Sequence, residues 1–293
     1  MEITIKNNKI NKLRSYSSMF SSSYFKDLIK NEDYSFIQEN AAQYDSKKIG
    51  TEIITYYDYL QYTYKQLCKQ YKNEYIYKNT FINDYLISKY GLKDSIVINE
   101  FKVGNSIADL VLFNGTSKAF EIKTELDNKK RLPGQLEDYQ NIFKECYVVV
   151  PESLANSYVN LNENIGIIIM MINKSGGLKM EQIKSPKINN DISVDTLMRT
   201  LRTNEYKAIV KNYYGYLPTM NSFNMFETST ELIKDIPKEN LHDLFIKQMK
   251  KRKSNTKELK GFLKELRQIG LALNISQSVN NSLIEKLNQP IQL

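Results

Sequence analysis

The spacing of apolar residues along the chain changes twice. Through residues 1–70 apolar positions recur at helical spacing, most clearly in "TEIITYYDYLQYTYKQLCKQY". Shorter, strand-like apolar runs follow, and after about residue 184 helical spacing returns. We therefore predict an N-terminal helical region over 1–70, an α/β core over 71–183 and a C-terminal helical region over 184–293.

The predicted core alternates strands with helices. The expected order is a helix over 74–90, strands over 95–101, 107–113 and 119–123, a helix over 131–145, a strand over 146–151, a short helix, and a strand over 165–172. The continuous apolar run "CYVVV" is typical of a central strand that is covered on both faces. Hairpin-connected strands followed by a strand–helix–strand unit predict a mixed sheet.

The C-terminal helical region contains one strongly periodic segment, "TKELKGFLKELRQIGLAL". Its apolar residues follow the i, i+3, i+4, i+7 spacing of an amphipathic helix, which predicts one helix here. The four positions are Leu259, Phe262, Leu263 and Leu266.

Two strands of the core carry charged residues where a buried strand would be apolar. Residues of a strand alternate between the faces of a sheet, so Glu121 and Lys123 share one face while Phe120 and Ile122 share the other. Asp109 opens the preceding strand. We predict that Ile122 lies in the core and that the two acids and the lysine face an open site.

The connection between these strands decides whether Asp109 reaches that face. A two-residue Asn-Gly turn, which the sequence favours, would put Asp109 opposite Phe120, on the wrong face. A connection of three or five residues, or a bulge, is required to bring Asp109 opposite Glu121 or Lys123.

Two carboxylates that converge in a sheet repel each other unless a cation lies between them. A hard cation such as Mg²⁺, or Mn²⁺ in its place, suits two carboxylates and water. A neighbouring lysine can orient the attacking water or stabilise charge on a phosphate. The alternative is a cross-strand ion pair on a solvated face, and the short D…ExK pattern alone does not decide between the two.

The composition limits the other kinds of chemistry. Among 293 residues there are two cysteines, Cys68 and Cys146, without a CxxC neighbour, and one histidine, His242. A zinc site of the usual cysteine and histidine kind is therefore almost excluded. We interpret the cysteines as reduced packing residues of a cytoplasmic protein, and His242 as a partly buried or surface residue.

No apolar run reaches the roughly 18–20 residues needed to cross a bilayer, and the N-terminus lacks the apolar stretch of a secretory signal. We therefore expect no membrane partner.

The net charge of +8 favours a polyanionic partner, most often nucleic acid. A lysine-rich composition is equally expected of AT-rich coding sequence. Nine basic residues between Lys247 and Arg267 either follow a phosphate backbone or form a solvated helix face.

The order of the site residues resembles the PD-(D/E)xK nuclease superfamily, whose restriction-endonuclease-like fold has an αβββαβ core. Asp109 matches the first acid of the motif, and Glu121-Ile122-Lys123 matches (D/E)xK. The similarity covers roughly residues 74–171, and it extends to a group of small stand-alone bacterial nuclease-like proteins.

The segment "QLEDY" resembles the QxxxY helix of the RecB-type branch of that superfamily. Its Gln135 and Tyr139 share a helix face at i, i+4. This chain has no histidine before His242, which departs from the upstream histidine motif of the same branch, and it lacks the four cysteines of the iron–sulfur members.

The resemblance implies a metal-dependent nuclease acting on DNA. Asp109, Glu121, the Ile122 carbonyl and Glu74 would form the metal site, with Glu100 and Asp84 as alternatives to Glu74. Lys123 would position the attacking water. The residues expected to support the site or contact substrate are Gln135, Tyr139, Lys129, Lys130 and Arg131.

A second function class stays open from the sequence. The chain could keep the nuclease fold and act as a non-catalytic nucleic-acid-binding or regulatory adaptor, with a protein partner or as a homodimer. Intact acids and lysine favour the enzyme. The resemblance also implies a link to mobile elements or phage defence.

Overall fold

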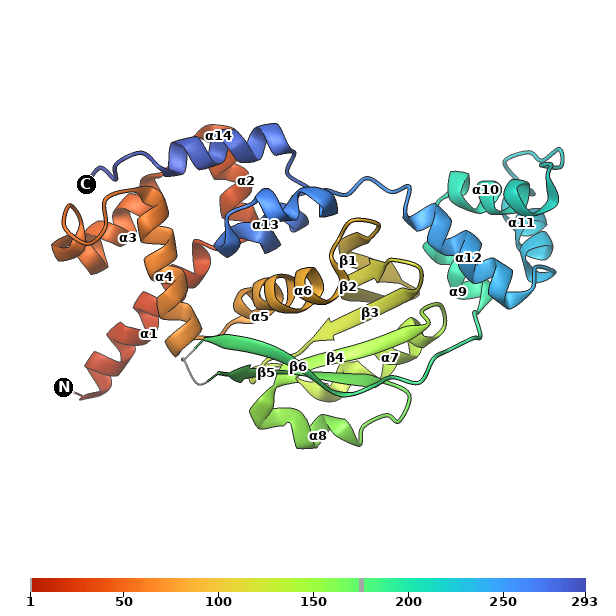
Figure 1. Ribbon diagram of the computed structural model, residues 1–293, viewed down its shortest axis with the longest axis horizontal. Coiled ribbons are helices and arrows are strands. Elements are labelled where there is room, and N and C mark those ends of the chain that lie inside the picture. The colour runs from red at the N-terminus through yellow and green to blue at the C-terminus, as the bar shows by residue number, and fades with distance from the viewer. Residues whose placement is uncertain (1, 174–176) are drawn as a thin grey trace. The chain divides into compact units, whose positions relative to one another are not determined.

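The computed structural model describes residues 2–173 and 177–293 (Figure 1), and contacts divide the chain into two compact units. The first unit contains the described residues up to Lys89, those of 171–180, and Asn255–Leu293. The second contains Tyr90–Met170 and Glu181–Ser254. The three regions expected from the sequence do not map onto these units one to one, because the helices after residue 184 are shared between them.

The first unit is helical. Its helices are α1 (Glu2–Ser18), α2 (Ser22–Asn31), α3 (Ser35–Asp45), the 3₁₀ helix η1 (Ser46–Lys48), α4 (Tyr56–Gln70), α5 (Glu74–Thr80), the π-helical η2 (Phe81–Leu86), α6 (Ile87–Tyr90), the 3₁₀ helices η5 (Thr256–Gly261) and η6 (Lys264–Leu266), α13 (Arg267–Ala272) and α14 (Gln277–Leu287). Helix α4 begins at a capping box formed by Thr55 and Asp58, as its sequence favours.

The tyrosines of this unit belong to its core. Tyr16 and Tyr59 are fully buried, and both hydroxyls donate to the buried carboxylate of Asp45. Lys12 neutralises that carboxylate at 2.8 Å. A buried charge is tolerated here because it is paired and hydrogen-bonded.

The second unit is built on the mixed sheet that the sequence predicts. The strands are β1 (Ile96–Val103), β2 (Ser106–Phe113), β3 (Ser117–Ile122), β4 (Glu145–Pro151), β5 (Gly166–Ile172) and β6 (Leu178–Lys184), in that order across a six-stranded sheet. β1, β2 and β3 pair antiparallel, whereas β3, β4 and β5 pair parallel. The expected α/β class is thus confirmed.

The helices of this unit pack on the sheet and on each other (Figure 1). They are η3 (Lys129–Arg131), α7 (Leu132–Gln140), η4 (Glu152–Leu154), α8 (Ala155–Val159), α9 (Val194–Thr200), α10 (Thr203–Tyr214), α11 (Met225–Lys234) and α12 (Lys238–Met249). Helix α7 contacts β2 and β4, and α9 contacts β1. Helix α7 ends at Gln140, five residues earlier than expected.

Strand β6 is missing from the sequence-based prediction. Only Met180 within it is buried, and charged residues alternate around it. An edge strand of this kind carries too little apolar signal to be distinguished from a polar linker.

The single helix predicted over "TKELKGFLKELRQIGLAL" is wrong. Phe262 and Leu263 have extended backbone conformations, with ψ of 151° and 132°, and they interrupt the helix between η5 and α13. Leu259, Phe262 and Leu266 are nevertheless buried. The apolar spacing therefore reflected burial correctly but did not require a continuous helix.

The basic residues between 247 and 267 do not form one helical edge either, because the boundary between the two units falls at residue 254. Arg252 binds Glu205 through two hydrogen bonds of 2.7 Å and lies 5.1 Å from the centre of the Phe101 ring. Arg252 is therefore engaged inside the second unit.

No helix in the described part of the chain has the length and apolar character needed to cross a membrane.

Candidate active site

A three-residue connection, Asn114–Thr116, joins β2 to β3, and it pairs Phe113 with Ser117. Gly115 adopts φ of +115°, which side chains disfavour, so glycine suits this turn. The two-residue Asn-Gly turn favoured by the sequence is therefore wrong. Extending the observed register by two residues beyond Val111↔Ala119 places Asp109 opposite Glu121, which is the arrangement the site requires.

Asp109 lies at the point where β2 and β3 stop pairing through their backbones. Its Oδ2 accepts a hydrogen bond from the backbone N–H of Ile122 at 2.7 Å. Ile122 itself is only 3% exposed and pairs with Val149 of β4. The predicted core position of Ile122 is thus where the structure places it, and Asp109 is held against the end of β3.

The Glu121 carboxylate is the centre of a buried polar cluster. Its Oε1 accepts hydrogen bonds from Lys123 Nζ and from Gln135 Nε2, both at 2.7 Å. Its Oε2 lies 2.7 Å from the hydroxyl of Tyr139. The structure therefore brings three of the predicted side chains around the carboxylate of Glu121, a residue that is 3% exposed.

Burial raises the pKa of Glu121, and the nearby negative charge of Asp109 raises it further. The ammonium of Lys123 and the hydroxyl of Tyr139 act in the opposite direction. The Tyr139 hydroxyl also lies 2.8 Å from the carbonyl oxygen of Ile107. It has one proton for two acceptors, so a protonated Glu121 could donate to Tyr139 while Tyr139 donates to Ile107.

Lys123 follows directly after β3 and is fixed by both main chain and side chain. Its backbone N–H donates to Val149 O at 2.9 Å, and its ammonium also contacts Gln135 Oε1 at 3.1 Å. The side chain is buried against Glu121. An ammonium held in this way has a defined position at the end of the sheet.

Helix α7 supplies Gln135 and Tyr139 from one face, as their spacing predicts. The helix is tied to the β1–β2 turn by Asp138, which accepts hydrogen bonds from Asn105 N at 3.2 Å and Ser106 Oγ at 2.5 Å. Gly104 in this turn has φ of +57°, and a Cβ there would lie 2.6 Å from the Asp138 carboxylate. The turn thus fixes α7 over the strand that carries Asp109.

Glu100 is a third acid beside this cluster. In the register of β1 against β2 it stands opposite Asp109, and the backbone pairing is interrupted there. Its φ is +53°, an unfavourable conformation for a residue with a side chain, and it is exposed. Strained residues of this kind concentrate at functional sites, which makes Glu100 a stronger alternative to Glu74 than the sequence indicated.

Glu74 lies in the first unit, at the first position of α5, where it forms an ion pair with Lys78 at 2.5 Å. Its part in a metal site stays a prediction. Lys129, Lys130 and Arg131 form η3 and are exposed. Lys129 contacts the Ser157 carbonyl and the Tyr158 ring, so its side chain is directed toward α8.

The residues at the cluster fit a hard divalent cation. Within the described ranges, no three His, Cys, Asp or Glu side chains are grouped closely enough to hold a metal ion. Mg²⁺, however, commonly keeps several waters and binds through one or two carboxylates. Asp109 and Glu121 supply two carboxylates. Burial and then the charge of Asp109 raise the pKa of Glu121, and a cation between the two acids would relieve their repulsion.

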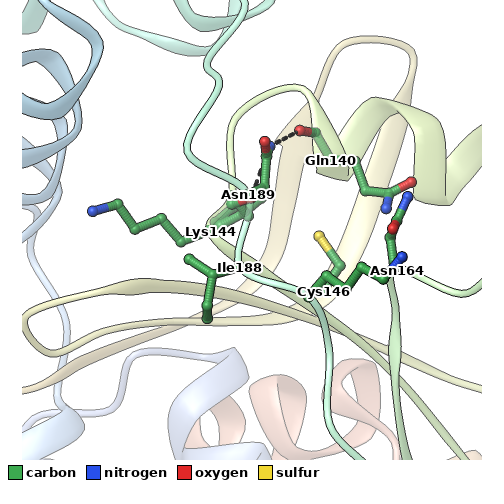
Figure 2. A pocket seen from close by; sticks show the side chains of 8 residues that line it. Gln140, Lys144, Cys146, Asn164, Ile188 and Asn189 are labelled. Atoms are coloured by element: carbon green, nitrogen blue, oxygen red, sulfur yellow. Dashed lines mark hydrogen bonds between the residues drawn. The ribbon is translucent and has the colours of Figure 1, made fainter.

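A separate cavity of about 350 Å³ lies at the start of β4, also in the second unit. Figure 2 shows the side chains that line it. Cys146, Lys144 and Asn189 line it, and Asn189 donates a hydrogen bond to the carbonyl of Gln140. No residue predicted for the nuclease site lines this cavity. It therefore does not belong to the Glu121 cluster.

His242 was expected to be partly buried or exposed, but it is fully buried in α12. Neither ring nitrogen has a hydrogen-bond partner among the described residues. Burial, followed by the charge of Lys144, lowers its pKa to about 4. The ring is thus a neutral packing group.

Comparisons with known proteins point to a phage family. The sequence pattern of the family described as "Bacteriophage P4 protein cII" matches residues 65–273. Protein cII of Enterobacteria phage P4 is 28% identical over 133 residues, which is 44% of this chain and 50% of that protein. The match thus spans about half the length of this curated relative.

Among solved structures, the SPO1766 protein of unknown function from Silicibacter pomeroyi aligns at 9% identity with a TM-score of 0.31. The alignment covers 50% of this chain and 94% of that protein. A TM-score this low supports no inference about either chain.

Proposed function

This chain belongs to the family of bacteriophage P4 protein cII, and we propose that it is a metal-dependent nuclease that hydrolyses phosphodiester bonds in DNA. The observation that carries the proposal is the position of Asp109 opposite Glu121, with the Lys123 ammonium 2.7 Å from the Glu121 carboxylate. Two acids and a lysine at the end of adjacent strands are the groups this reaction uses.

In the proposed mechanism, Asp109, Glu121 and the Ile122 carbonyl would hold Mg²⁺ or Mn²⁺. The ion would supply Lewis-acid polarisation of the phosphate and lower the pKa of a bound water. Lys123 orients the attacking water and stabilises the negative charge that develops on the phosphate. Gln135 and Tyr139 keep Glu121 in position through their hydrogen bonds of 2.7 Å.

The curated relative is a phage protein, so we place the proposed activity in the context of mobile elements or phage defence. The net charge of +8 supports a nucleic-acid substrate. DNA is the expected substrate, and RNA is the comparison that the assay must include.

The test is degradation of plasmid DNA, single-stranded DNA and RNA with Mg²⁺ or Mn²⁺. Lys123→Ala is expected to lower the rate on the order of 10²–10⁴-fold without loss of folding. Asp109→Asn should do the same, because the amide can still accept the Ile122 hydrogen bond but binds metal weakly. Excess Mn²⁺ should partly restore cleavage by Asp109→Asn. Lys102→Ala, an exposed lysine on β1, is the matched control and should leave cleavage unchanged.

Two outcomes would overturn the proposal. Cleavage that survives Asp109→Asn combined with Lys123→Ala would place the active site elsewhere. Wild-type protein that binds DNA tightly but cleaves neither DNA nor RNA with either metal would favour the non-catalytic adaptor.

A further inference from the structure

The first unit contains a cavity of about 580 Å³, and of the residues weighed for the nuclease site only Asp84, an alternative to Glu74 in the sequence-based metal site, lines it. Its walls come from α4, from α5 and η2, from η6, and from Asn173 and Gly177–Lys179, which belong to the first unit. The lining residues that carry charge are Lys65, Lys69, Asp84, Lys179, Lys264 and Glu265. A cavity of this volume falls in the range of about 300–1,000 Å³ that holds small-molecule ligands.

The wall between α5 and η6 is rigidly built. The side-chain amides of Asn79 and Asn83 both donate to the carbonyl of Lys264 at 3.0 Å. The backbone N–H of Gln268 donates to Asn79 Oδ1 at 3.0 Å, and Arg267 Nη1 donates to Asn83 Oδ1 at 2.9 Å. These contacts fix the segment that carries Lys264 and Glu265 against the helix.

The helix itself is distorted at the cavity. Residues Phe81–Leu86 form a π-helical turn, and Asn83 and Asp84 of this turn line the cavity. Single π-helical turns inside α-helices are rare and frequently mark functional sites. The distortion is an observation independent of the cavity, and it falls on the same residues.

The cavity carries an excess of positive charge. Among the described residues, the ammonium groups of Lys65, Lys69 and Lys264 form no ion pair. Of the two carboxylates, Glu265 is already engaged by the Tyr57 hydroxyl at 2.8 Å. Burial raises the pKa of Asp84, and the charges of Lys264 and Arg267 act in the opposite direction. Four lysines against these two carboxylates leave a net positive lining. The balance favours an anionic ligand.

The remaining wall is suited to a ring system. Tyr64 lines the cavity and is held by packing against Phe20 at 5.7 Å between ring centres. Cys68 and Leu178 add apolar surface, while Thr80 and Asp84 offer hydrogen-bonding oxygens. A bare phosphate would leave most of this surface and volume unused.

We propose that this cavity binds a phosphorylated nucleoside, either as a free nucleotide or as the phosphorylated end of a nucleic-acid strand. The lysines would hold the phosphate, and Tyr64 with Leu178 would contact the base. The site lies in the first unit and needs no metal, so it does not depend on the proposed cleavage reaction.

The test uses the full chain in EDTA, so that cleavage does not occur. Isothermal titration calorimetry would compare ATP, AMP, inorganic phosphate, and a short oligothymidylate with and without a 5′-phosphate. Lys65→Glu combined with Lys69→Glu should weaken binding of the preferred probe by about 10–100-fold, because two attractive charges become repulsive. A preference for ATP or AMP would indicate a free nucleotide, and a preference for the 5′-phosphorylated strand would indicate a strand end.

The matched control is Lys26→Glu combined with Lys30→Glu, a pair of exposed lysines at the same i, i+4 spacing on α2. This control should change affinity less than about 2-fold. Thermal unfolding should show that both double variants are folded, and Lys264→Ala provides a milder second variant. Equal weakening by the two double variants, binding of inorganic phosphate as tight as that of ATP and AMP, or no binding of any probe would overturn the proposal. DNA cleavage by the Lys65/Lys69 variant is measured separately with Mg²⁺. Retained cleavage would show that the effect on ligand binding is independent of the proposed nuclease site.

Discussion

Asp109 stands opposite Glu121 across the β2–β3 pair, and this relationship follows from the pairing of Phe113 with Ser117 on either side of the turn. If Phe113 paired with Thr116 instead, across a two-residue Asn114-Gly115 turn, Phe120 would stand opposite Asp109. Whether the two acids of the proposed site face each other thus depends on the register of the hairpin as much as on the D…ExK motif.

The hairpin leads to a prediction about turn length. Deleting Thr116 leaves Asn114-Gly115 as a two-residue turn between Phe113 and Ser117, so the Asp109–Glu121 register is kept and a favoured turn type becomes accessible. We expect stability within about 1 kcal/mol of wild type and retained cleavage. Deleting Ala119 within β3 instead shifts every later residue of the strand to the other face of the sheet. This deletion should abolish both the stable fold and cleavage. Thermal unfolding and the plasmid assay measure the two variants, and an inactive Thr116 deletion would contradict the proposed dependence on register.

The hydrogen bond of Tyr139 leads to a second prediction. Tyr139→Phe removes the hydroxyl that lies between Glu121 Oε2 and the Ile107 carbonyl, and it should destabilise the protein by about 1–3 kcal/mol. The hydroxyl lowers the pKa of Glu121, so its loss raises that pKa further above the usual carboxylate value. Protons then compete more strongly with the metal.

The pH–rate profile of Tyr139→Phe should accordingly move to higher pH, and more Mg²⁺ should be needed at a given pH. Tyr213→Phe, at an exposed tyrosine on α10, is the control. An unchanged profile in Tyr139→Phe would mean that Glu121 does not exchange a proton for a metal ion.

Glu100 and Glu74 can be distinguished as the third acid. Glu100→Gly removes a side chain from a backbone conformation that glycine adopts readily, so stability should rise by about 1 kcal/mol. If Glu100 supports the metal, directly or through water, cleavage should nevertheless fall about 10-fold. Glu74→Gln should then have little effect. The reverse order of effects on cleavage, measured at several Mg²⁺ concentrations, would restore Glu74 as the third acid.

The change of apolar period predicted the mixed sheet and most elements correctly, because a buried strand and an amphipathic helix place apolar residues at different intervals. It could not locate β6, whose single buried side chain is Met180. Nor could it predict the break at Phe262. The backbone there is extended, but the side chain is still buried, so the apolar spacing looks the same as in a continuous helix.

The site was predictable only in part. The period of two in β3 put Glu121 and Lys123 on one face, and the i, i+4 spacing in α7 put Gln135 beside Tyr139. The contact of that helix face with Glu121 depends on how Asp138 ties α7 to a turn 32 residues earlier. The backbone strain at Glu100 likewise left no signal in the sequence.

His242 gives the last prediction, and as the only histidine it gives a clean one. Its pKa is about 4 in the folded protein against an ordinary value of 6.5, so between these values the unfolded chain binds a proton that the folded chain does not. Stability is therefore lost as the pH falls from about 6.5 to 4, by up to about 3 kcal/mol from this residue. The groups that act on the ring are Lys144, Lys238, Asp243 and the backbone of Asp191, which raises the pKa although it does not reach hydrogen-bond geometry with either ring nitrogen.

His242→Leu should remove this part of the pH dependence. Because neither ring nitrogen has a partner among the described residues, leucine should preserve or increase stability at pH 7. Thermal unfolding of both proteins between pH 4.5 and 7.5 measures the difference, in which the contributions of carboxylates common to both cancel. The melting temperature of wild type should fall more steeply below pH 6.5 than that of His242→Leu. Parallel curves would mean that the ring gains a proton partner in the folded protein, contrary to its burial in α12.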